Sequence, residues 1–78
     1  MTDIQFYDFT VMKTDQEILL NFATKVKHLR TLKGITQQDA YNDTGIHFGR
    51  IEQGKRDVSL TTLIRIAKYF NVQIDNLV

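Results

Sequence analysis

The sequence has no cysteine and no proline, and it has only two histidines and one serine among its 78 residues. Without cysteine there is no disulfide and no thiolate metal site, so hydrophobic packing must hold the fold together. The histidines, His28 and His47, fall on different predicted helices, and no spacing brings three metal ligands together. Ser59 stands where a helix cap is expected, and a glycine-rich phosphate loop is missing. These absences argue against an enzyme, a cofactor, a metal site or a small-molecule substrate.

Long hydrophobic runs are also missing. No apolar stretch approaches the length of a membrane span, although 42% of the residues are hydrophobic. The first residues, MTDIQFYDF, carry acidic groups where a secretory signal would need basic ones, which favours the cytoplasm. A chain of this length allows one domain, and helices packed through local contacts are an economical way to build its core.

The net charge is only +1, but the charges are unevenly distributed. Residues 1–20 are acidic on balance, whereas residues 21–38 contain basic groups and no acidic one. A second group of basic residues follows, and it outweighs the single acid in residues 49–56: Arg50, Lys55 and Arg56. A polyanion such as DNA would therefore meet a local basic patch rather than a uniformly positive surface.

The first third of the chain is predicted to be a short extended arm followed by a long helix. Residues 1–13 form the arm, in which apolar and polar side chains roughly alternate, and which we expect to pack on its own domain or on a second copy. Thr14 and Glu17 have the spacing of a capping box, and Gly34 is a natural helix stop. The predicted helix over 14–33 carries one apolar stripe: Ile18, Phe22, Val26, Leu29 and Leu32.

Residues 36–53 are predicted to form two short helices with a tight turn between them. Thr36 would cap a helix over 36–43, whose inner face is Ala40 with either Tyr41 or Thr44. Gly45 breaks that helix, and a second helix over 46–53 would bury Phe48 and Ile51. Ser59 then caps a further helix, and residues 72–78 are compatible with a last helical turn that closes the core. The apolar residues of these last two elements are Leu60, Leu63, Ile66, Ala67, Phe70, Ile74 and Leu77.

From about residue 20 to residue 78 the chain resembles the phage repressor/Cro-like helix-turn-helix family, also called the xenobiotic response element type. The resemblance is carried by Leu29-Arg30, Gly34-Ile35-Thr36-Gln37, Gly45-Ile46, Arg50-Ile51-Glu52-Gln53-Gly54-Lys55-Arg56, Ser59-Leu60, Leu63, Ala67, Val72 and Leu77. It implies an all-α, five-helix DNA-binding domain over residues 14–78. The family binds duplex DNA, usually as a dimer, to control transcription.

The chain departs from the family pattern in one respect. Between Thr36-Gln37 and Ile51-Glu52 it is about three residues shorter than usual, which is close to one helical turn. Either the first helix of the motif ends early or the recognition helix loses its first turn, where base contacts are made. Gly49 lies within this region, and a glycine inside a helix needs a packing or close-approach reason.

Seven residues are predicted to bind DNA. Thr36 and Gln37 begin a helix whose free amides favour a phosphate, although Thr36 is first of all a cap. His47 and Arg50 should point away from the core: Arg50 could bond guanine, and His47 could meet a base edge or a phosphate. Gln53 could read adenine or contact only backbone. Lys55 and Arg56 follow Gly54 and suit phosphate neutralisation. We do not count Arg30 and Glu52 as DNA contacts, because the resemblance implies that they form a partly buried structural ion pair.

These residues favour a sequence-specific, duplex-DNA-binding transcriptional regulator that acts as a homodimer. The alternative is a helix-turn-helix module that binds protein, such as an antitoxin-like subunit. The apolar arm gives this alternative some support. DNA binding that weakens steeply with salt would distinguish the two, because a protein interface of such modest charge should respond weakly to salt.

Overall fold

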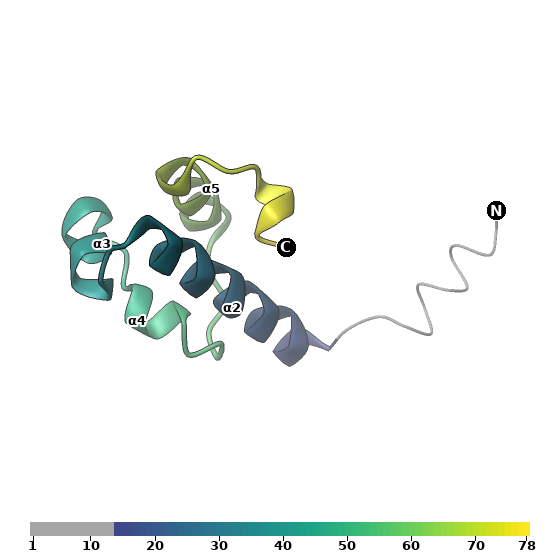
Figure 1. Cartoon of the computed structure of the whole chain (residues 1–78). Helices are drawn as coiled ribbons and strands as arrows, with labels where there is room; N and C mark the ends of the chain where they lie inside the picture. The colour runs from purple at the N-terminus through teal and green to yellow at the C-terminus, as the bar shows by residue number, and fades with distance from the viewer. Residues whose placement is uncertain (1–13) are drawn as a thin grey trace.

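The computed structural model describes residues 14–78, and the predicted arm of residues 1–13 lies outside the described residues. Between residues 14 and 78 there is no strand, so this part of the chain is all-α, as predicted. The elements are α2 (Asp15–Lys33), α3 (Gln37–Thr44), α4 (Phe48–Ile51), α5 (Leu60–Phe70) and the 3-10 helix η1 (Ile74–Asn76) (Figure 1). The predicted last helical turn is therefore the 3-10 helix η1.

Local capping sets where the helices begin. The Thr14 hydroxyl accepts a hydrogen bond from the Glu17 amide at 3.1 Å, and the Glu17 carboxylate accepts one from the Thr14 amide at 2.9 Å. Thr36 and Asp39 form the same reciprocal pair at the start of α3. The Ser59 hydroxyl accepts from the Thr62 amide at 3.1 Å and caps α5. Each predicted cap is confirmed, because it needs only groups three residues apart.

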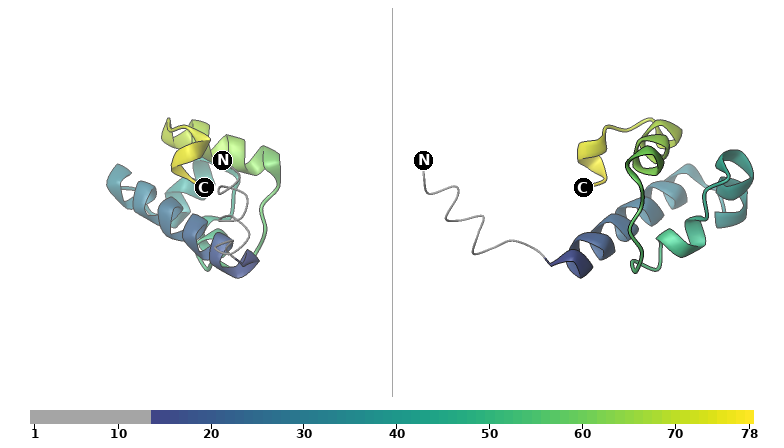
Figure 2. Two further views of the ribbon diagram at one scale, coloured as in Figure 1. Left: turned by 90° about the vertical axis from the view of Figure 1, so that its right-hand side faces the viewer. Right: turned by 180° about the vertical axis from the view of Figure 1, so that it is seen from behind.

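The core lies where the helices converge on α2. Figures 1 and 2 show α5 and η1 on one side of α2, with α3 and α4 grouped beside its C-terminal half. The largest fully buried side chains come from different elements and meet there: Val26, Phe48, Ile66 and Leu77. The ring of Phe48 packs edge-on against that of Phe70, with 5.9 Å between centroids. Thus α4, although short, is anchored in the middle of the core.

The apolar stripe of α2 is buried only in its middle. Phe22 and Val26 are buried, but Ile18 is 48% exposed and Leu32 is 70% exposed, so the two ends of the predicted stripe lie at the surface. Near the C-terminus of α2 the buried positions are Val26 and Arg30, which lie four residues apart on one face. Leu32 falls on another face of the helix and is therefore exposed.

Helix α4 is much shorter than the helix predicted over 46–53. Gly45 has a φ of 76° and ends α3, and the helix starts only at Phe48. The Thr44 hydroxyl donates to the Ala40 carbonyl at 2.7 Å and accepts from the Ile46 amide at 3.0 Å. This holds the buried Ile46 in the turn. Because α3 keeps its full length, the missing residues fall on α4.

Candidate nucleic-acid interface

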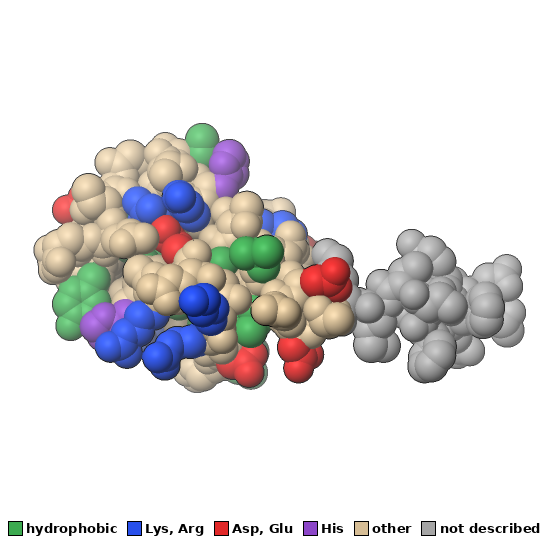
Figure 3. Space-filling model, turned by 90° about the horizontal axis from the view of Figure 1, so that it is seen from below, with side chains coloured by type: hydrophobic (Ala, Val, Ile, Leu, Met, Phe, Trp, Pro, Cys, Tyr) green, Lys and Arg blue, Asp and Glu red, His purple; other side chains and the backbone are tan. Residues whose placement is uncertain are grey.

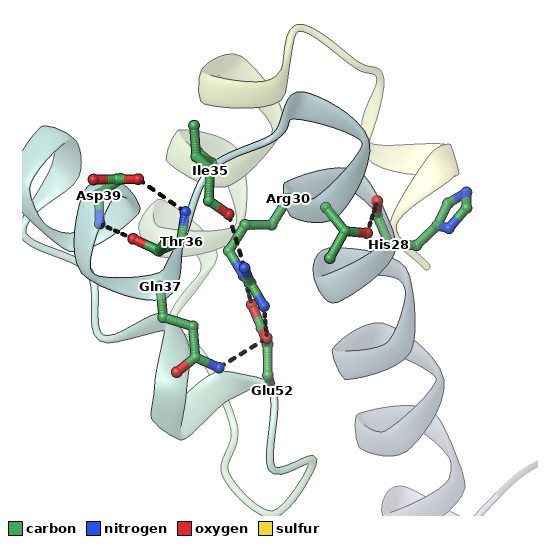
Figure 4. A network of polar contacts seen from close by, with 8 residues as sticks. His28, Arg30, Ile35, Thr36, Gln37, Asp39 and Glu52 are labelled. Atoms are coloured by element: carbon green, nitrogen blue, oxygen red, sulfur yellow. Dashed lines mark hydrogen bonds and ion pairs between the residues drawn. The ribbon is translucent and has the colours of Figure 1, made fainter.

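A bidentate ion pair connects the end of α2 to the end of α4 (Figure 4). Arg30 donates to Glu52 from Nε at 2.7 Å and from Nη2 at 2.9 Å. Its Nη1 donates to the main-chain carbonyl of Ile35 at 2.8 Å. Arg30 is only 8% exposed. The pair therefore fixes α4 relative to both α2 and the loop that precedes α3, and it uses three of the five N–H donors of Arg30.

Gln37, the first residue of α3, joins this network. Its Nε2 donates to Glu52 Oε1 at 3.0 Å. Burial raises the pKa of Glu52, but hydrogen bonds from Arg30 and Gln37 and the charges of Arg30 and Lys27 outweigh burial and hold that pKa below its usual value. Glu52 is thus ionised at neutral pH, and the hydrogen bond to it raises the pKa of Arg30 in turn. The side-chain nitrogen Nε2 of Gln37 is thus hydrogen-bonded to the Glu52 carboxylate.

His47 immediately precedes α4 and stacks on Tyr41 of α3. The ring centroids are 4.7 Å apart and the planes differ by 30°. Tyr41 is 39% exposed, whereas Thr44 is half-buried, so Thr44 and not Tyr41 shares the inner face of α3 with Ala40. Gln37, Gln38 and Gly49 complete a hollow of about 450 Å³ beside the stacked rings. Our sequence reasoning missed Tyr41 as a surface residue, although it follows Gln37 by four positions and so shares its face of the helix.

A second depression, of about 300 Å³, lies on the other side of His47. Three arginines and one acid line it, Arg50, Arg56, Arg65 and Asp57, so the lining is basic on balance, and Ser59 and Thr62 add hydroxyl groups. Arg65, on α5, also donates to the main-chain carbonyl of Thr44. On the side of the molecule where α4 lies, Figure 3 shows Lys and Arg side chains gathered beside a histidine. Sequence reasoning missed Arg65, because the contact joins positions 21 residues apart and carries no local signal.

The remaining candidates lie outside both depressions. Gln53 and Lys55 are exposed in the turn after α4. This turn is closely packed: Gly54 is buried with a φ of 72°, and a Cβ there would lie 3.2 Å from the Leu20 backbone. The Thr36 hydroxyl oxygen accepts the capping bond from the Asp39 amide. A hydroxyl can donate its hydrogen while it accepts, so the predicted phosphate contact of Thr36 is compatible with the cap.

Two short helices joined by a tight turn, braced from α2 by a buried ion pair, are the geometry of a helix-turn-helix. The helix-turn-helix family model matches residues 26–77. The chain belongs to the phage repressor/Cro-like helix-turn-helix family. DNA binding and transcription regulation are the functions that this membership supports.

A curated relative is also named as a helix-turn-helix protein. The chain is 38% identical over 56 residues to a protein of Methanocaldococcus jannaschii named as an uncharacterized HTH-type transcriptional regulator. That similarity covers 68% of this chain and 85% of the relative. No solved structure matches the chain significantly. Within residues 14–78, no helix combines the length and the apolar character that a membrane span requires.

Proposed function

We propose that this helix-turn-helix protein is a sequence-specific regulator of transcription that binds duplex DNA as a homodimer. The observation that carries the proposal is the position of Arg50 and Arg56 in one basic depression at the exposed edge of α4. The Arg30–Glu52 pair holds that helix rigidly against α2. Rigid presentation of cationic side chains next to a short helix suits insertion into a major groove.

Base reading in this proposal depends on very few side chains. Within α4, Phe48 and Ile51 are buried and Gly49 has no side chain, which leaves Arg50 to face the DNA. His47, stacked on Tyr41, lies directly before it. We propose that Arg50 contacts guanine and that His47 contacts a base edge or a phosphate. Such a narrow reading surface makes a second half-site, and hence a dimer, necessary for specificity.

Phosphate contacts would supply most of the affinity. We assign them to Lys55 and Arg56 in the turn after α4, and to Arg65 on the opposite wall of the depression. Gln37 would contribute its main-chain amide at the N-terminus of α3 rather than its side chain, which is bound to Glu52. Gln53 is exposed one position before the buried Gly54, and we assign it to the DNA backbone.

The second candidate function is a protein-interaction module, such as an antitoxin-like subunit. It is favoured by the exposed apolar side chains of the domain: Ile18, Leu20, Leu32, Leu60 and Val78. A protein partner could cover these groups. We prefer DNA because the basic depression and the braced α4 lie together, whereas these apolar side chains are spread over α2, the start of α5 and the C-terminal residue.

Two measurements test the proposed function. Affinity for random duplex DNA should fall steeply with salt, with each neutralised phosphate adding about −0.9 to the slope of log K against log salt. Selection of bound duplexes from a random pool should then return a palindrome with fixed half-site spacing. A flat salt response, or no binding at low salt, would exclude the DNA-binding function and leave the protein-interaction module.

A further inference from the structure

An apolar groove lies on the domain at the N-terminal half of α2. It has a volume of about 170 Å³ and contains one polar side chain, that of Asp57. The other residues that line it are Ile18, Leu19, Phe22, Val58, Leu63 and Val78. Ile18 is 48% exposed and Val78 is 61% exposed, so the groove opens to solvent.

The groove has walls that are fixed by the fold. Phe22 and Leu63 belong to α2 and α5, and both are packed in or against the core. Lys25 Nζ donates to the main-chain oxygen of Val78 at 3.0 Å and holds that end of the wall against α2. A defined apolar surface of this kind suits a ligand with a few apolar side chains on one face.

The chain itself has a segment with apolar side chains at alternate positions, in the thirteen residues that precede Thr14. Phe9 and Val11 are two positions apart, as are Ile4 and Phe6. In an extended chain, residues two apart point to the same side, so each pair presents one apolar face. Thirteen extended residues span at most about 43–47 Å, which is ample to reach a groove on a neighbouring domain.

The sequence around Thr14 favours a groove on another copy over the arm's own. Thr14 has an extended backbone, with φ −72° and ψ 163°, as the cap of α2. To place Val11 over Ile18 of the same chain, the backbone would have to reverse within Met12 and Lys13. Chain reversals favour glycine, proline, asparagine, aspartate or serine, and residues 9–14 contain none of these.

We propose that the groove at Ile18, Phe22 and Leu63 binds the apolar arm of a second copy of this chain. The exchange is reciprocal, with each arm seated on its partner, as a two-fold dimer requires. The inference rests on the homodimer in the proposed function and identifies the surface that makes it. It does not depend on DNA.

The absence of cysteine allows a direct test in the full chain without DNA. The Thr10→Cys variant introduces a single thiol between Phe9 and Val11, and a nitroxide label is attached there. Labelled protein of natural isotope content is mixed with unlabelled, ¹⁵N-enriched wild-type chain. We expect the label to broaden the amide signals around Ile18 and Leu63 in the ¹⁵N copies. A second sample carries the label and ¹⁵N in the same chain. Broadening in that sample alone would overturn the exchange between copies, and no broadening in either sample would exclude the groove as the binding site of the arm.

A matched pair of variants locates the contact. Ile18 and Leu32 are both exposed apolar residues of α2, but only Ile18 lines the groove. In the ¹⁵N copies, Ile18→Gln should abolish the broadening around Leu63 and Leu32→Gln should retain it. Equal effects of the two substitutions would contradict the assignment. Retained broadening in a protein that binds no duplex would support the arm contact while the DNA-binding function fails, so the two proposals fail separately.

Discussion

The Gln37 side chain approaches Gly49 closely across the helix-turn-helix. A Cβ atom at Gly49 would lie 3.2 Å from Gln37 Oε1, which is closer than comfortable van der Waals contact. The same Gln37 side chain donates to Glu52 through Nε2. The close approach of the Gln37 side chain thus favours glycine in α4, because a Cβ there would have to displace Gln37 Oε1 by a few tenths of an ångström.

The effect of replacing Gly49 on the free energy of unfolding should depend on whether Gln37 is present. Gly49→Ala gains helix propensity of about 1 kcal/mol but pushes against Gln37. We expect the gain in unfolding free energy to be small or negative in the wild-type background. In a Gln37→Ala background, where the neighbour is gone, most of that 1 kcal/mol should be recovered. Urea unfolding of the four proteins of this double-mutant cycle measures the coupling, and identical effects in both backgrounds would disprove the contact.

Arg30→Ala should lower stability and DNA affinity together, because we propose that Arg30 acts through Glu52 and makes no DNA contact of its own. The substitution leaves the buried Glu52 carboxylate without its main partner, which costs about 3–5 kcal/mol. Thermal melting and duplex binding are measured on the same preparation. Glu52→Gln is the control and should also destabilise. If Arg30 instead contacted phosphate, its loss would weaken binding at an unchanged melting temperature, and Glu52→Gln would leave stability alone.

Arg50→Ala should change the sequence preference of DNA binding, whereas Lys55→Ala should change the overall affinity. We expect Arg50→Ala to relax sequence preference, with a loss of about 1–3 kcal/mol of discrimination at one base pair. Lys55→Ala should weaken selected and random duplexes alike and reduce the salt slope by about 0.9. Titrations of both variants against both kinds of duplex, at several salt concentrations, give the comparison. The base-reading assignment of Arg50 fails if both variants affect the two duplexes equally.

Tyr69 should titrate late and should stabilise the fold only while it is protonated. Its hydroxyl donates to Asp43 at 2.6 Å, and burial together with that carboxylate raises its pKa to about 12. Since the folded pKa lies above the usual value near 10, the stabilisation is complete below about pH 10 and is lost as the pH rises through 12. The difference in tyrosinate absorbance between wild type and Tyr69→Phe measures this ionisation. A midpoint near 10 would show that the bond to Asp43 does not persist in solution.

Much of the fold could be predicted from the sequence, because the signals for the helix ends are local. The capping boxes at Thr14 and Thr36, the Ser59 cap and the stop at Gly34 each involve groups within one turn of the chain. These local hydrogen bonds do not require contacts with distant parts of the chain. The family, too, is determined by the sequence, through residues that recur at fixed spacing.

Only the tertiary structure decided the length of α4 and the make-up of the surface around it. Ile46 is buried as part of the turn instead of in a helix, and Arg65 reaches Thr44 from α5. Tyr41 lies outside, stacked on His47. Each outcome depends on which residues meet from distant parts of the chain. A local pattern gives the period of a helix, but the packing of the other helices decides which of its residues are covered and where it must begin.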